Sequence, residues 1–166
     1  MTYLPQPVEP GPGQESVWDY PRPPRLEPFV GIITVDLGGQ TIAHCERAWR
    51  VLETSHPPTY YLPREAFIEA SLQPISGASW CEWKGQATYY NLVGGGRVAR
   101  RAAWTYLKPT AGFSPLAGAI AVMAAGVDRC TVNGEQVVAQ PGGFYGGWIT
   151  SWVVGPFKGV PGSMGW

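Results

Sequence analysis

The 166-residue chain has few charged residues, and their charges cancel. Lys and Arg together number 12, Asp and Glu together also number 12, and all four types make up 14% of the sequence. A chain without net charge presents no positive field to a phosphate backbone or an anionic membrane surface. We therefore expect neither nucleic acid nor a membrane among its partners.

Long apolar runs are also missing. The longest, LAGAIAVMAAGV at 116–127, is too short to cross a bilayer as a helix. The first residues, MTYLPQPVEPGPGQ, show neither the basic region nor the apolar region of a secretory signal. These features predict a soluble, cytoplasmic protein.

Closely spaced metal ligands are missing as well. Cys45, Cys81 and Cys130 lie far apart with no CxxC pair, and His44 and His56 are the only histidines. Zinc sites usually draw on closely spaced ligand pairs, and an odd number of scattered thiols does not form a disulfide framework. We expect reduced cysteines that serve packing, with no metal and no cofactor.

Glycine, proline and aromatic residues are plentiful instead. The chain has 22 glycines and 17 prolines, and Phe, Trp and Tyr make up 13% of it. This composition is typical of short strands joined by tight turns, and the length suits one domain. Residues 1–28, with PRPP at 21–24, are predicted to form an extended arm that packs on a single β domain of residues 29–166.

Two hairpins stand out in the pattern of apolar residues. FVGIITVDL and QTIAHC flank Gly38-Gly39, and DRCTV and EQVVA flank Asn133-Gly134, a pair typical of two-residue turns. Only PREAFIEAS, at 63–71, begins like a helical turn. The sum is a mainly β, antiparallel domain whose sheet curls or closes to hide its edges. Further strands are predicted at 49–55, 58–62, 86–93, 100–107 and 118–123.

The segment RRAAWTYLK, at 100–108, combines aromatic and cationic residues. Strand alternation would place Trp104 and Tyr106 on one face, together with Arg100, Ala102 and Lys108. Such a face can line a pocket for a flat or apolar ligand, and it can equally form an aromatic layer of the core.

The segment LETSHPPTYY, at 52–61, contains His56. A residue before proline is pushed into extended backbone, so Pro57 is expected to hold the imidazole in a fixed direction beside Tyr60 and Tyr61. Adjacent strand residues point to opposite sides, so Ser55 and His56 do not form the start of a catalytic triad. This segment is predicted to form one wall of a pocket.

Lys84, in CEWKGQATYY, has two interpretations. Beside Trp83 and near tyrosines it can be a desolvated base or nucleophile with a lowered pKa. Alternatively it is a solvated lysine in a turn that leads into a strand.

Six stretches together carry a family resemblance: SVWDYPRPPRLE (16–27), RAWRVLETSHPPTYYLP (47–63), CEWKGQATYY (81–90), AAWTY (102–106), VNGEQVVAQPGGFYGGWIT (132–150) and GPFKGVPGSMGW (155–166). The chain resembles the domain of unknown function 427 family, found in many bacteria and some fungi and also labelled nucleotidyltransferase-like. The resemblance implies a single compact β domain of the β-tent or Mss4-like group. Other tents bind zinc through CxxC pairs, which this sequence lacks, and it has neither a P-loop nor a Gly-Ser loop with paired aspartates.

Three functions remain open at this point. The first is binding of a small organic ligand, without metal, in an aromatic-lined pocket. The second is a metal-independent hydrolase or group or nucleotidyl transferase, with His56 as proton shuttle beside Glu53 or Lys84. The third is a structural homodimer built by the arm and the aromatic tail. The pocket residues predicted for the first are Arg50, Glu53, His56, Tyr60, Tyr61, Trp83, Lys84, Tyr89, Trp104, Tyr106 and Trp148.

Overall fold

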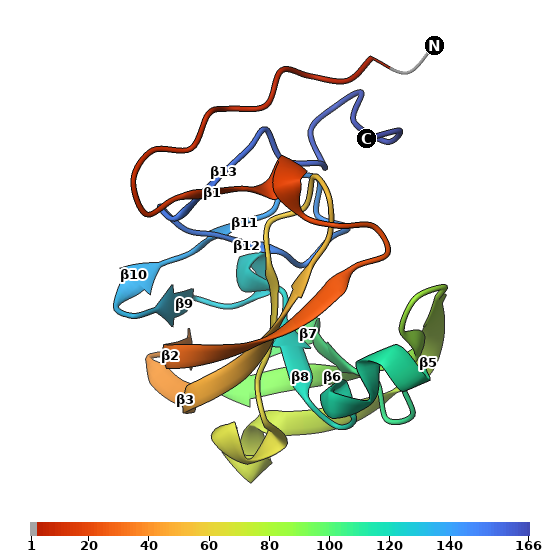
Figure 1. Cartoon of the computed structure of the whole chain (residues 1–166). Helices are drawn as coiled ribbons and strands as arrows, with labels where there is room; N and C mark the ends of the chain where they lie inside the picture. The colour runs from red at the N-terminus through yellow and green to blue at the C-terminus, as the bar shows by residue number, and fades with distance from the viewer. Residues whose placement is uncertain (1–2) are drawn as a thin grey trace.

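Two antiparallel sheets form the body of the protein (Figure 1). The structure is a computed structural model that describes residues 3–166, in which the only helical elements are short 3-10 turns. This confirms the predicted mainly β, antiparallel domain. The first sheet has the order β10-β9-β2-β3-β4 and the second β5-β6-β7-β8. Their strands are β2 (Arg25–Leu37), β3 (Gln40–Leu52), β4 (Thr59–Tyr61), β5 (Leu72–Cys81), β6 (Gly85–Gly94), β7 (Arg97–Thr105), β8 (Ile120–Val122), β9 (Arg129–Val132) and β10 (Glu135–Gln136).

Both predicted hairpins are confirmed. Gly38 and Gly39 join β2 to β3 with φ values of 62° and 80°. Asn133 and Gly134 join β9 to β10 with φ values of 50° and 83°. Positive φ at both turn positions matches the right-handed twist of the flanking strands, which is why glycine and asparagine occupy them. The separate strand predicted at 49–55 is wrong, because β3 continues without a break to Leu52.

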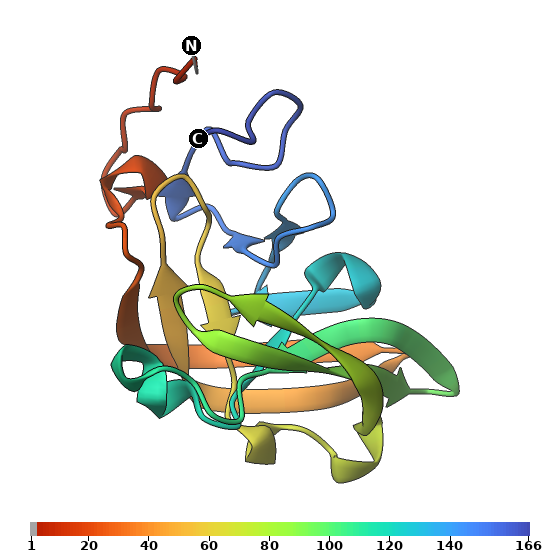
Figure 2. The same ribbon diagram turned by 90° about the vertical axis from the view of Figure 1, so that its right-hand side faces the viewer.

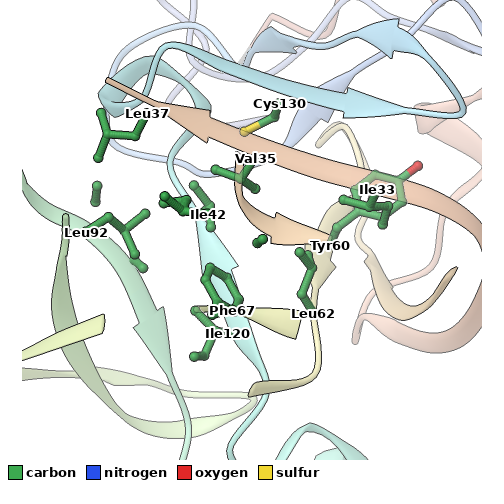
Figure 3. Close-up of a cluster of buried hydrophobic side chains, with 14 of the residues drawn as sticks. Ile33, Val35, Leu37, Ile42, Tyr60, Leu62, Phe67, Leu92, Ile120 and Cys130 are labelled. Atoms are coloured by element: carbon green, nitrogen blue, oxygen red, sulfur yellow. The ribbon is translucent and has the colours of Figure 1, made fainter. Parts of the chain in front are cut away.

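The main core lies between the two sheets (Figure 3). Ile33, Val35 and Leu37 alternate along β2 and belong to the same buried cluster as Leu92 of β6, and all four are almost fully buried. Burying each such side chain stabilises the fold by about 1.5–3 kcal/mol relative to exposure. The alternating apolar residues that predicted the strand are therefore also the ones whose burial holds the two sheets together.

A backbone bridge connects the sheets at one end. The amide of Leu62, just after β4, donates to Ile120 O of β8, and the amide of Ile120 donates to Leu62 O, both at 2.8 Å. The bridge covers strand edges that would otherwise be open to pairing with another chain. The two sheets thus curl around a shared interior, as Figure 2 shows from the side.

The strand β5 was not predicted from the sequence. It contains Pro74 and Gly77, which disfavour a central strand, but it lies at the edge of its sheet and pairs only with β6. The single helical turn predicted at 63–71 is instead two 3-10 turns, η2 (Arg64–Ala66) and η3 (Glu69–Ser71), which lead into β5.

A β-bulge changes the predicted faces of β7. The register with β6 shifts between Tyr90 and Leu92, and Arg101 has a φ of 55° with its amide donating to Asn91 Oδ1 at 2.8 Å. Because a bulge reverses the alternation, Ala102 packs in the main core while Arg101 faces the same cavity as Trp104. The single face predicted from Arg100 to Lys108 is therefore wrong.

The N-terminal arm folds back on the C-terminal segment. Strand β1 (Glu15–Ser16) pairs in parallel with β13 (Val153–Val154), and the indole of Trp18 donates to Pro156 O at 2.9 Å. Figures 1 and 2 both show the two ends of the described chain on the same side of the body. The remaining elements are η1 (Val17–Asp19), η4 (Ala111–Leu116), η5 (Ala124–Gly126), β11 (Val138–Ala139) and β12 (Trp148–Ile149).

Within residues 3–166, no helix has both the length and the apolar character needed to cross a membrane.

Candidate functional site

A cavity of about 630 Å³ opens beside the second sheet. Its walls come from the ends of β3 and β4, the hairpin of β5 and β6, the strand β7 and the loop at 143–146. This volume lies in the range of pockets that hold small organic molecules. The segments meet here only in the folded chain, since they are spread from Val51 to Lys158.

Most of the predicted site residues line this cavity. Tyr61 comes from β4, Tyr89 from β6 and Trp104 from β7, so three different strands supply the aromatic walls. The structure thereby brings together residues separated by up to 53 positions, from Glu53 to Tyr106. The full set of predicted residues in the lining is Glu53, His56, Tyr61, Lys84, Tyr89, Trp104 and Tyr106.

Four predicted residues lie elsewhere. Tyr60 and Trp148 stack in the main core with ring centroids 5.2 Å apart, and the Trp148 indole donates to Val122 O at 2.9 Å. Strand alternation explains this for Tyr60, because its neighbour Tyr61 takes the face that lines the cavity. Trp83 packs against a second, smaller buried cluster that includes Phe113 and Leu116, and it lies outside the cavity lining.

Arg50 is the fourth predicted residue outside the cavity, and its ion pairs connect the N-terminal arm to the first sheet. Its guanidinium contacts Glu15 at 2.8 Å and Glu27 at 2.7 Å, and the residue is only 8% exposed. Burial alone lowers the pKa of Arg50, but the hydrogen bonds that it donates to Glu27 and Glu15 outweigh burial and raise the net pKa. Arg50 therefore stays charged as a structural ion-pair centre.

Gln140 holds His56 in one orientation, and sequence reasoning missed it. The Gln140 amide nitrogen lies 2.9 Å from His56 Nδ1 and donates to Lys158 O at 2.9 Å, while its oxygen accepts from the Gly147 amide at 3.0 Å. The two backbone groups fix which end of the side-chain amide carries nitrogen, so Nδ1 accepts. In the neutral imidazole the proton then sits on Nε2, which faces Glu53 Oε2 at 3.4 Å.

Glu53 is the carboxylate of the cavity. Burial raises its pKa, but the hydrogen bond and charge of His56, with the charges of Lys84 and Arg22, outweigh burial and leave the pKa below its ordinary value. Arg22 approaches the same carboxylate at 3.7 Å. Glu53 is thus ionised at neutral pH and lies between the His56 imidazole and the Arg22 guanidinium.

Lys84 differs from both interpretations given above. Burial lowers its pKa, but the acidic groups of Tyr61, Cys81 and Glu53 outweigh burial and raise the net value. The side chain is partly buried, with its Nζ 5.7 Å from the centre of the Tyr106 ring. Lys84 is therefore a partly buried, charged lysine in the cavity wall. It is neither a solvated surface lysine nor an amine with a lowered pKa.

A glycine-flanked aromatic loop closes one side of the cavity. A Cβ at Gly146 would overlap the indole ring of Trp104, and one at Gly147 would lie 2.5 Å from Pro57 O. Only glycine permits this close approach. The loop then places the Tyr145 ring 4.7 Å from the His56 ring in an edge-to-face contact.

Two exposed aromatic side chains stand at the cavity opening. Trp80, at the end of β5, is 75% exposed and Phe144 is 82% exposed, yet both contribute to the lining. Sequence reasoning missed Trp80 because β5 itself was not predicted. Large exposed aromatics beside a cavity are a common feature of ligand-binding surfaces.

No three His, Cys, Asp or Glu side chains of residues 3–166 gather where they would hold a metal ion. Cys45 and Cys130 are buried, whereas Cys81 lines the cavity beside Lys84. A bound molecule would meet hydroxyl, indole, ammonium and guanidinium donors and the Glu53 carboxylate as an acceptor.

The fold and the cavity define a small β protein with a ligand-sized interior site. A family model described as "Domain of unknown function (DUF427)" matches residues 25–133, more than half of the chain, and the protein belongs to this family. The match covers β2 to β9 and ends before Gln140 and the aromatic loop. A search of curated proteins found no match.

Proposed function

We propose that this protein binds a small organic ligand in the cavity described above. The observation that carries the proposal is a cavity of about 630 Å³ walled by aromatic rings from three strands, with a few polar groups directed to it. Ligand sites typically combine a largely apolar wall with a small number of orienting polar groups. Glu53, His56 and Lys84 would provide the orienting groups.

The aromatic walls are held in place before any ligand arrives. The Trp104 indole donates to the Tyr61 hydroxyl at 3.3 Å, and the two rings meet edge to face at 6.3 Å. Tyr61 in turn contacts Tyr106 with ring centroids 6.2 Å apart. A wall that is already ordered reduces the entropy lost on binding, which favours useful affinity for a small molecule.

Untargeted mass spectrometry of small molecules that co-purify with the full chain tests the proposal. Trp80→Ala removes an exposed ring from the cavity opening without disturbing the core, and Tyr3→Ala removes an equally exposed aromatic from the arm. We expect a molecule retained by the wild type and by Tyr3→Ala to be lost from Trp80→Ala. Retention of every co-purifying molecule by Trp80→Ala and by Trp104→Ala would contradict the proposal.

A second candidate function is acid-base catalysis, favoured by the chain of contacts from Gln140 through His56 to Glu53. In the neutral imidazole Nδ1 accepts from Gln140, so His56 has no free lone pair for substrate and orients Glu53 instead. Glu53 is then the candidate base. The test is whether the wild type converts the co-purified molecule to a product and Glu53→Gln binds it without converting it. Unchanged ligand after incubation with the wild type counts against catalysis.

The homodimer stays a prediction. The arm contacts the C-terminal segment of its own chain through β1 and Trp18. Light scattering of the purified protein measures its oligomeric state.

A further inference from the structure

Three cations line the cavity: Lys84, Arg101 and Lys158. Among the described residues, no Asp or Glu carboxylate lies within 4.0 Å of any of their charged nitrogens. Lys158 donates to the backbone oxygen of Trp166 at 3.2 Å. The cavity thus collects positive charge in a protein whose net charge is zero.

Each of these cations is held against a tyrosine ring of the same cavity. The Lys84 Nζ lies 5.7 Å from the Tyr106 ring centre, and the Lys158 Nζ lies 5.6 Å from the Tyr145 ring centre. The guanidinium of Arg101 lies 3.9 Å above Tyr89. Lys84 and Arg101 each lie against an aromatic face with no carboxylate in contact, so they keep their full charge and free N–H groups, whereas Lys158 already donates to Trp166 O.

Glu53, the carboxylate of the lining, offsets only part of this charge, because it lies more than 4.0 Å from the Lys84 ammonium. It already contacts His56 at 3.4 Å and Arg22 at 3.7 Å. Tyr61 and Tyr106, the hydroxyl neighbours of Lys84, are neutral at neutral pH because burial raises their pKa values. The cavity therefore has a surplus of donors and positive charge facing its interior.

We propose that the cavity selects a flat organic anion, one that carries a carboxylate or a phosphate group received by Lys84, with Arg101 and Lys158 adding attraction. This rests on the proposed function and names the chemical class of its ligand. A partly buried ammonium with no carboxylate within 4.0 Å gains most from an anion, since hydrogen bonds between charged groups in a poorly hydrated site are the strong ones. Trp104 and Trp80 supply the apolar faces for the flat part of the molecule.

A set of four small probes of similar shape tests the charge preference on the full chain. Benzoate carries a carboxylate, phenyl phosphate a phosphate, benzamide no charge and benzamidine a positive charge. Binding is followed by the shift of the Trp104 indole resonance in NMR titrations, and by protection of Cys81, which lines the same cavity, from iodoacetamide. Lys84→Met keeps most of the side-chain stem, and Lys108→Met removes an exposed lysine outside the lining as the matched control.

We expect benzoate, phenyl phosphate or both to bind at least about tenfold more tightly than benzamide. Benzamidine should bind most weakly. Lys84→Met should remove most of that advantage and leave benzamide unchanged, while Lys108→Met behaves as the wild type. The ratio of benzoate to phenyl phosphate binding distinguishes a carboxylate ligand from a phosphate ligand.

Equal binding of benzamide and the two anions would overturn this inference and leave the proposed function in place, because the cavity would still hold a ligand. An anion preference that persists in full in Lys84→Met would overturn the assignment of the anion to Lys84. Failure of all four probes to shift Trp104 or protect Cys81 up to their solubility limits would contradict both proposals.

Discussion

Gln140→Ala should destabilise the protein more than most single substitutions. Gln140 is 4% exposed and bonds three groups: His56 Nδ1, the Lys158 carbonyl and the Gly147 amide. Truncation leaves the two backbone groups without partners, and each buried unsatisfied group costs about 1–3 kcal/mol. We expect the free energy of unfolding to fall by about 3 kcal/mol, which lowers the Tm by about 6–12 °C for a chain of this size.

Urea and thermal unfolding measure this loss. Gln136→Ala is the matched control, because Gln136 is exposed and its side chain makes no hydrogen bond within the described residues. The ¹⁵N shifts of the His56 imidazole supply a second readout. In the wild type the neutral ring should carry its proton on Nε2, and in Gln140→Ala the Nδ1 resonance should shift because that nitrogen loses its donor.

Either of two results would show that Gln140 does not hold His56 and the two backbone groups in this way. One is a neutral His56 in the wild type with its proton on Nδ1. The other is a Gln140→Ala variant that unfolds at the same urea concentration as Gln136→Ala.

Three further predictions follow from the buried groups and the cavity. Only Cys81 should react quickly with iodoacetamide in the folded protein, because Cys45 and Cys130 are buried; mass spectrometry of labelled peptides identifies the site, and rapid labelling of Cys130 would contradict the packing. Burial raises the pKa of Cys45 to about 11 and of Cys130 to about 12, from 9.0. Their stabilising contribution is therefore complete below pH 9.0 and is lost as the pH rises toward these values, at about 1.4 kcal/mol per pH unit for each thiol. Urea unfolding from neutral to alkaline pH should show this fall and a shallower one in Cys45→Ala; identical slopes would exclude a contribution from Cys45. Gly146→Ala should displace Trp104 and cost about 1–3 kcal/mol, while Gly112→Ala, whose added Cβ has open space, should leave thermal stability nearly unchanged.

The strands and turns of this protein could largely be predicted from local patterns. Alternation in β2 and the turn residues at Gly38-Gly39 and Asn133-Gly134 act over a few positions, and the structure has them as expected. The strand β5 escaped prediction because its proline and glycine are acceptable only at a sheet edge, and edge position depends on distant strands.

The residues of the candidate site also depend on distant contacts that local sequence patterns do not show. The pattern of aromatics around His56 and Trp104 indicated a pocket, but local alternation could not separate Tyr60, which packs in the core, from Tyr61, which lines the cavity. The bulge at Arg101 reversed one face of β7, and no signal in the sequence of β7 alone indicates it. Gln140 lies 84 residues from His56, so nothing near either residue connects them.

Composition and short-range pattern were enough to specify a mainly β, antiparallel domain, because strand alternation and turn conformation are properties of neighbouring residues. Which side chains share the cavity depends instead on how two sheets curl together, where a bulge falls and which glycines let a loop reach Trp104. Those features arise from contacts between segments far apart in the chain. They therefore exist only once the chain has folded, and they include the aromatic-supported cations that give the cavity its charge.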